Sequence, residues 1–133
     1  LYTTFNGSIQ VYLCPSLTSI SAPNAIELYC SYCTSLTSVS APNATDLDCI
    51  DCPSLTSISA PNATSIDASG CALTSVTIAA QLAATVANIA DLSTVAIDFS
   101  GGTNANYTTW SAQAQADAET IINAGGSVTY NDI

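Results

Sequence analysis

The sequence predicts a repeat β-solenoid of short coils with a 19-residue period and an α/β cap at its C-terminal end. Three observations support this prediction. The stretch CPSLTSISAPN stands at 14–24 and again, unchanged, at 52–62, with CTSLTSVSAPN between them at 33–43. A period near twenty is typical of stacked repeat units. Four cysteines recur at this same interval: Cys14, Cys33, Cys52 and Cys71.

Each coil is expected to contribute two short strands. In SVSA (38–41) and DLDC (46–49), apolar residues alternate with small or polar ones, which is the pattern of a strand with one buried face. Pro42 and Asn43 mark the turn between the two strands. A coil this short cannot bury its own apolar face, so it requires a neighbour on each side. The repetition is therefore first a solution to packing.

The period stops near Thr77, which divides the chain into a solenoid of about four coils (1–78) and a cap (79–133). Residues 79–92 place Leu82, Val86 and Ile89 on one face of a helix. Residues 94–102 and 127–130 read as strands. Residues 108–126 predict a second helix that ends at two glycines and has four residues on one face: Trp110, Ala114, Ala118 and Ile121.

The charge inventory excludes several classes of function. Among 133 residues there is no Lys, Arg or His, and ten acidic residues give a net charge of −10. Binding to nucleic acid or to an anionic membrane requires cations that this chain lacks. No apolar run of about 20 residues predicts membrane insertion. Without a His base or a Lys nucleophile, we expect no catalytic residues and no enzymatic activity.

The coils resemble leucine-rich repeats of the BspA-like type over roughly residues 5–78. That branch is built on L-x-x-I-x-I-P followed by a second short apolar stretch and a Cys. The coils here are shorter than the usual repeat of the family. The matching residues are Leu17, Ile20, Ala22 and Pro23, then Leu36, Val39, Ala41 and Pro42, then Leu55, Ile58, Ala60 and Pro61. The resemblance implies the architecture and is only a weak indication of function.

Residues 98–131 resemble the tail of repeat proteins from phage tail-fibre-like reading frames, although the usual Lys of that tail is absent. This resemblance implies a virion or extracellular surface location. The chain begins at Leu1, which indicates either processing or a piece of a longer protein. The first coil has no obvious polar cap, so we expect that something covers that end.

The six cysteines have three readings. Cys30-x-x-Cys33 and Cys49-x-x-Cys52 follow each other at a zinc-ribbon spacing, but the 19-residue period produces this spacing unaided. The favoured reading is a stack of buried thiols that act as small apolar side chains, with Cys14 and Cys71 continuing one column. Disulfides within a coil or between coils are the second reading, and a metal site is the third.

One face of the predicted solenoid varies from coil to coil, as binding surfaces of repeat proteins do. Its tyrosines could stack on a sugar ring, and its carboxylates suggest Ca²⁺, although three of them alone supply too few oxygens. A solvated acidic face is the alternative. The candidate binding residues are Tyr12, Tyr29, Tyr32, Asp46, Asp48, Asp51 and Asp67.

Two further features repeat along the chain. Hydroxyl side chains are expected in two outward columns, which suggests ice binding as a minor alternative: Ser19, Ser38, Ser57 and Ser75, then Ser21, Ser40, Ser59 and Thr77. N-glycosylation motifs occur at four positions: Asn6, Asn43, Asn62 and Asn106.

The sequence thus predicts a non-enzymatic extracellular protein with a structural or adhesive role. The first hypothesis is a phage virion component, such as a fibre or decoration module, or a surface adhesin that meets glycan or protein partners. The second hypothesis is a subunit that self-associates into an extracellular filament through its first coil.

Overall fold

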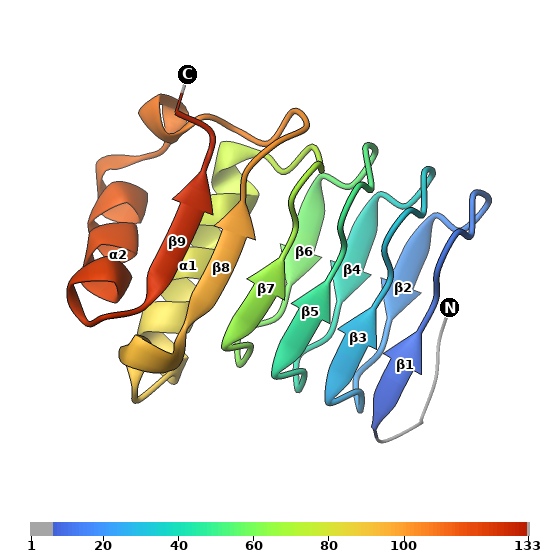
Figure 1. Ribbon diagram of the computed structural model, residues 1–133, viewed down its shortest axis with the longest axis horizontal. Helices are drawn as coiled ribbons and strands as arrows, with labels where there is room; N and C mark the ends of the chain where they lie inside the picture. The colour runs from blue at the N-terminus through green and yellow to red at the C-terminus, as the bar shows by residue number, and fades with distance from the viewer. Residues whose placement is uncertain (1–6, 133) are drawn as a thin grey trace.

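The computed structural model describes residues 7–132 and shows an α/β fold with parallel strands in two sheets and two α-helices. The sheets lie one behind the other, and the helices gather at the C-terminal end (Figure 1). The six-stranded sheet has the order β1 (Ser8–Gln10), β3 (Glu27–Tyr29), β5 (Asp46–Asp48), β7 (Ser65–Asp67), β8 (Ala96–Phe99) and β9 (Ser127–Tyr130). The three-stranded sheet has the order β2 (Ser19–Ser21), β4 (Ser38–Ser40) and β6 (Ser57–Ser59).

The sequence repeat matches the register of the sheets, so equivalent residues of successive repeats are direct partners. Ile20, Val39 and Ile58 are direct partners across the three-stranded sheet, and all three are buried. The middle residues of β3 and β5, Leu28 and Leu47, are partners across the other sheet and are likewise buried. Because side chains alternate along a strand, each strand sends its middle residue into the space between the sheets. The repeat units, here called coils, therefore share one continuous core.

Neighbouring coils are joined by backbone and side-chain hydrogen bonds. The backbone N–H of Thr37 donates to the carbonyl of Thr18 at 2.8 Å. At the Pro-Asn corner, Asn43 Nδ2 donates to the carbonyl of Pro23 at 2.7 Å. The same bond recurs one coil later, where Asn62 Nδ2 donates to the Pro42 carbonyl at 2.9 Å. The side chain of the repeated asparagine thus links each Pro-Asn corner to the corner of the previous coil by a hydrogen bond.

The cysteine column at the opposite turn makes a bond of the same kind. Cys33 Sγ lies 3.4 Å from the carbonyl of Val11, and Cys71 Sγ lies 2.9 Å from the carbonyl of Cys49. All six cysteines are free, Cys14 is half-buried, and the other five are buried. The buried thiols of Cys33, Cys52 and Cys71 therefore fill the core and also donate to a carbonyl of the preceding coil.

Helix α1 (Ser75–Asn88) takes the place of a fourth strand in the three-stranded sheet. Its N-cap is Thr74, whose side chain accepts from the backbone N–H of Thr77 at 3.2 Å. The prediction that Ser75 and Thr77 extend the outward hydroxyl columns is therefore wrong. The helix begins before residue 79 because the Thr74 cap and the buried Ile78 and Leu82 already match a helical period.

Side-chain amides from the cap supply the partners that a further coil would have supplied. Buried Gln81 on α1 accepts from the backbone N–H of Ala60 at 3.0 Å and donates to the Ala60 carbonyl at 2.9 Å. Buried Asn104 accepts from the Leu73 N–H at 2.7 Å and donates to the Ala68 carbonyl at 2.8 Å. Because unpaired buried backbone groups are costly, these bonds let the repeat end without orphaned donors or acceptors.

Beyond α1, the chain rejoins the six-stranded sheet. Strand β8 pairs in parallel with β7 on one side and with β9 on the other, and both strands lie within the predicted strand segments 94–102 and 127–130. Helix α2 (Ala112–Asn123) begins after Ser111, whose Oγ accepts from the Ala114 N–H at 3.1 Å. Trp110 therefore precedes the helix and does not share its face, which corrects the predicted start. Its ring packs against Tyr107 and Tyr130 with centroids 5.2 and 5.3 Å away.

We expect Gln81→Leu to lower the free energy of unfolding by about 2–4 kcal/mol, because it leaves the N–H and carbonyl of Ala60 buried without partners. Urea unfolding followed by circular dichroism measures this change. Asn123→Ala, at an exposed position near the end of α2, is the control and should stay within about 0.5 kcal/mol of the parent. Equal stability of the Gln81 variant and the parent would contradict this account of how the sheet ends.

Candidate binding surface

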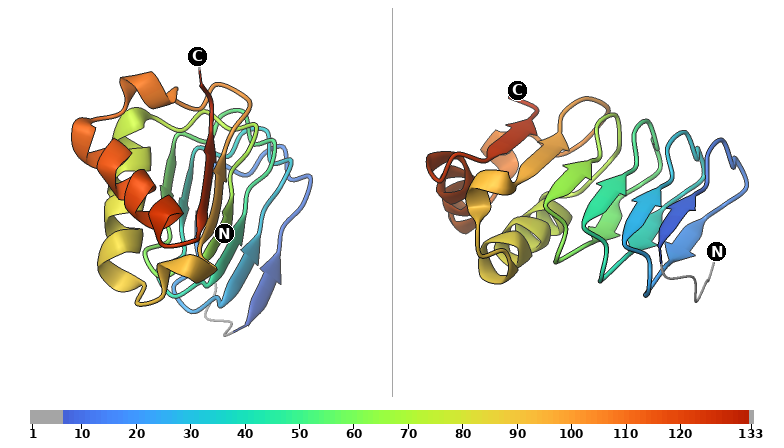
Figure 2. Two further views of the ribbon diagram at one scale, coloured as in Figure 1. Left: turned by 60° about the vertical axis from the view of Figure 1, so that its left-hand side comes forward. Right: turned by 60° about the horizontal axis from the view of Figure 1, so that its bottom comes forward.

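The outward side of the six-stranded sheet is the surface that changes from coil to coil, and we call it the variable face. Figure 2 shows that this face runs the full length of the molecule. Two side chains of each strand flank the inward middle residue. The first column is Ser8, Glu27, Asp46, Ser65, Ala96 and Ser127, and the second is Gln10, Tyr29, Asp48, Asp67, Asp98 and Thr129.

The second column holds three consecutive carboxylates, and sequence reasoning missed one of them. Asp98 in β8 is the direct partner of Asp67 in β7, although the two are far apart along the chain because the α1 segment intervenes. The signal was present, since SIDASG at 65–70 and AIDFSG at 96–101 differ at only two positions. A search for repeats with a fixed period cannot find it.

Each carboxylate in this column accepts hydrogen bonds from turns that border the sheet. Asp67 Oδ1 accepts from the N–H and Oγ of Ser69 at 3.0 and 2.7 Å. Asp98 Oδ1 accepts from the N–H of Ser100 at 2.8 Å. Asp48 Oδ1 accepts from Ser31 Oγ. In all three carboxylates Oδ1 is the acceptor, so Oδ2 accepts none of these bonds from the turns.

A shallow open hollow of about 260 Å³ lies over β7, β8 and β9. Its floor is formed by small residues of the first column: Ser65, Ala96 and Ser127. Asp67, Asp98 and Thr129 of the second column form its polar side. Small side chains next to carboxylates leave room for a polar ligand at this end of the variable face.

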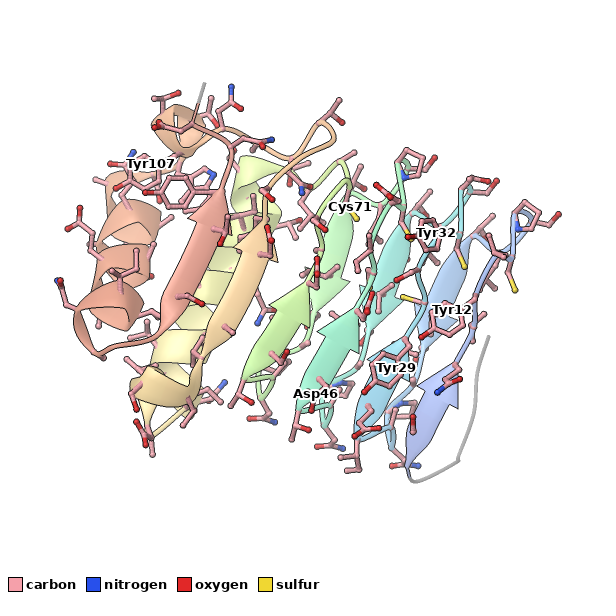
Figure 3. The ribbon with its side chains drawn as sticks, viewed as in Figure 1. Tyr12, Tyr29, Tyr32, Asp46, Cys71 and Tyr107 are labelled. Carbon is pink, nitrogen blue, oxygen red and sulfur yellow. The ribbon has the colours of Figure 1, made fainter. Side chains whose placement is uncertain are left out.

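Tyrosines gather at the other end of the same face. Tyr12 is 45% exposed, and Tyr29, on β3, is half-buried beside it (Figure 3). Partial burial raises the pKa of Tyr29, and the nearby carboxylates of Glu27 and Asp46 raise it further. The Tyr29 hydroxyl thus keeps its proton at neutral pH, and its hydrogen bond with Glu27 contributes to the raised pKa. The chain therefore presents aromatic rings beside carboxylates at one end of the face, and carboxylates along the open hollow at the other end.

Bulky residues occupy a strained backbone position at the turn after each strand. Leu13, Tyr32 and Asp51 have φ of 55°, 61° and 53°, while the equivalent later turns use Gly70 at 72° and Gly101 at 71°. A side chain in the left-handed region costs roughly 1–2 kcal/mol. Leu13 is 72% exposed and Tyr32 is 48% exposed, so packing does not offset this cost. These side chains are placed outward at the expense of stability.

The structure separates some of the residues that the sequence grouped together. Asp46 and Asp48 lie on β5, but Asp51 lies on the turn, where its carboxylate folds over Gly70. Ser31, the second residue after β3, is buried at 2% exposure and donates a hydrogen bond to Asp48. The second residue after β3 therefore belongs to the turn, and two columns of side chains form the variable face.

The three-stranded sheet presents a plainer outward surface. Its hydroxyl columns have three rungs each, Ser19, Ser38, Ser57 and Ser21, Ser40, Ser59, because α1 covers the place of the fourth. Of the glycosylation motifs, Asn43 and Asn62 already use Nδ2 in bonds between coils. Asn106 is half-buried before the 3-10 turn Tyr107–Thr109, and Asn6 lies outside the described residues.

Between residues 7 and 132, no group of three or more carboxylate or thiol side chains is placed so that it could hold a metal ion. Within the same range, no helix is long and apolar enough to cross a membrane. No protein-family model, curated protein or solved structure matches the chain. The variable face itself is therefore the basis for inferring a function.

Stability is expected to fall at alkaline pH under reducing conditions. The hydrogen bond with Cys30 and burial raise the pKa of Cys49, and burial raises the pKa of Cys33, above the ordinary thiol value of 9.0. The folded state then holds protons that the unfolded state releases above pH 9.0, so stability is full below that pH and declines as pH rises. Each buried thiol contributes up to about 1.4 kcal/mol per pH unit.

Urea unfolding at several pH values between about 8 and 11 measures this decline. Cys49→Ala provides the control, because Ala68 occupies the equivalent position one coil later. This variant should show a shallower decline than the parent. An identical slope in both proteins would contradict the assignment to Cys49.

Tyr32→Gly is expected to leave the free energy of unfolding unchanged or to raise it by up to about 1 kcal/mol. Glycine relieves the left-handed strain, and Gly70 already fits the equivalent turn. Urea unfolding of the parent and the variant checks this. A loss of more than about 1 kcal/mol would show that Tyr32 has a packing role.

Proposed function

We propose that this chain is a non-enzymatic extracellular repeat protein that binds surface glycan through the variable face and the turn that borders it. In this proposal it is a solenoid with short leucine-rich-repeat-like coils, and it serves as a phage fibre or decoration module or as a surface adhesin. One observation carries the proposal, namely the exposed Leu13 and Tyr32 at a turn position that costs stability. Strain without packing compensation at a surface is typical of a site selected for contact with a partner.

The chemistry of the face supports a neutral glycan in particular. A tyrosine ring can pack on the apolar face of a sugar while its hydroxyl forms hydrogen bonds. Carboxylates such as Asp67 and Asp98 accept hydrogen bonds from sugar hydroxyls along the hollow. With no cationic side chain in the chain, an anionic ligand would meet only repulsion. Neutral polysaccharide is the ligand class that fits both ends of the face.

The binding test uses a panel of neutral and acidic polysaccharides, with calorimetry on those that bind. We expect neutral glycans to bind and Tyr32→Gly to weaken binding about two- to tenfold, since a lost stacking contact of this kind is worth roughly 0.5–1.5 kcal/mol. Ser59→Ala, on the outward side of the other sheet, is the matched control and should bind like the parent. Binding that survives Tyr32→Gly, or that goes only to acidic glycans, would contradict the proposal.

Self-association through the first coil is the second candidate. Ile9 and Leu17 are only half-buried, whereas Leu28 and Leu36, one coil later, are fully buried. β1 is also the edge strand of its sheet. Light scattering on a sizing column over a range of concentrations, with electron micrographs of the fractions, tests this candidate. Long polymers would favour a filament subunit, and a discrete monomer would favour the binding module.

Ice binding is ranked third. Ice-binding arrays favour threonine, and the hydroxyl columns of the three-stranded sheet are serine and extend over three rungs. Measurement of thermal hysteresis distinguishes this candidate from the other two. A hysteresis that is lost in Ser59→Ala would place ice binding ahead of glycan binding.

A further inference from the structure

The six cysteines occupy two columns with different surroundings. The turn column, Cys14, Cys33, Cys52 and Cys71, donates its thiols to backbone carbonyls, as Cys52 Sγ does to Cys30 at 3.3 Å. The other column follows the strands of the six-stranded sheet and holds Val11, Cys30, Cys49 and Ala68 in adjacent coils. Cys30 and Cys49 are therefore the only two thiols of their column.

These two thiols contact each other. Cys30 Sγ lies 3.0 Å from Cys49 Sγ, and both residues are fully buried. Their backbones follow directly on the adjacent parallel strands β3 and β5 and stay bonded, since the N–H of Cys30 donates to the Asp48 carbonyl at 2.7 Å. Neighbouring strands lie about 4.8 Å apart, which is within the Cα separation of about 4.4–6.8 Å that a disulfide accepts.

The turn column contains one competing pair. Cys52 and Cys71 are neighbours in adjacent coils, and their interaction lowers the pKa of Cys52 to about 7. Each of these thiols also donates to a backbone carbonyl, Cys52 to Cys30 and Cys71 to Cys49. Oxidation of this pair would remove both donors and leave buried carbonyls with fewer partners, whereas the thiols of Cys30 and Cys49 hydrogen-bond to each other.

We propose that Cys30 and Cys49 form a disulfide that joins the second and third coils when the protein folds in an oxidising environment. The sulfur atoms need to approach by only about 1 Å to reach the S–S bond length. Because the turn cysteines are held by carbonyl hydrogen bonds, this pair is the one that the fold presents for oxidation. Neither Val11 nor Ala68 offers a competing thiol in the column.

The chemistry is thiol–disulfide exchange with a low-molecular-weight disulfide as the oxidant. One thiol loses its proton, and its sulfur attacks the oxidant to form a mixed disulfide, which releases one small thiolate. The second sulfur, after losing its own proton, displaces the second small thiolate and completes the Cys30–Cys49 bond. The two protein thiols are oxidised and the small disulfide is reduced to two thiols. Because both sulfurs are buried, the exchange belongs to folding, before the coils close.

A cross-link here would hold adjacent coils together in the unfolded chain as well as the folded one. It would therefore restrict the unfolded state and raise the melting temperature. The surrounding core excludes water and charged groups from the bond, which would also make it slow to reduce.

The test folds the protein in oxidised and reduced glutathione, blocks remaining thiols with an alkylating agent, and maps the linkage by mass spectrometry. The chain has no trypsin site, so chymotrypsin, which cuts after Tyr29 and Tyr32, is combined with a protease that cuts before Asp48 and Asp51. The expected product is residues 30–32 joined to residues 48–50, and an intact mass lower by two hydrogens. Six alkylated cysteines, or a link that involves a turn cysteine instead, would overturn the proposal.

Variants add a second readout. The oxidised parent should melt at least about 5 °C above the reduced parent. Cys49→Ala should lose both the cross-link and this difference, and Ala68 shows that the column accepts alanine. Cys52→Ala is the matched control, because it removes a turn thiol and should keep the 30–49 link. A melting difference that persists in Cys49→Ala would also overturn the assignment, and the linkage map of the parent decides the question even if a variant does not fold.

Discussion

The bond from each coil to the next is the constraint on which the rest of this protein depends. A single coil with two three-residue strands buries little by itself, so its backbone N–H and carbonyl groups must pair with those of its neighbours. In-register stacking satisfies them and places the middle residue of every strand in one core. The repeated Asn43 and Cys33 belong to the same system, because each bonds to a carbonyl of the preceding coil.

A stack held together in this way must also end. At its C-terminal end, side chains of the cap replace the hydrogen-bonding groups that a further coil would have supplied. Gln81 and Asn104 place buried amides where the next coil would have placed peptide groups. Gly102 shows how closely the returning chain passes, since a Cβ there would collide with the carbonyl of Cys71. The two sheets end differently: α1 covers one, while β8 and β9 extend the other.

The extension has a consequence for the surface. By continuing the six-stranded sheet, β8 brings Asp98 beside Asp67 and forms the open hollow with β9. At the other end, exposed Tyr12 and strained Tyr32 provide aromatic rings. The inner columns repeat because packing allows little else, whereas the outer columns are free to differ. The variable face and the turn that borders it are therefore where a partner would be recognised.

The sequence by itself determined the period, the two strands per coil, and the burial of Leu36 and Val39. These follow from local alternation and from repetition, which a single chain displays directly. Only the tertiary structure decided where the three-stranded sheet stops. The sequence around Thr74 and Ile78 begins a helix, although its residue pattern could also continue a strand. It also decided that Asp98 lies beside Asp67, that Ser31 is buried and that Cys30 contacts Cys49. Each of these depends on distances between coils, and those are set by register and packing rather than by spacing along the chain.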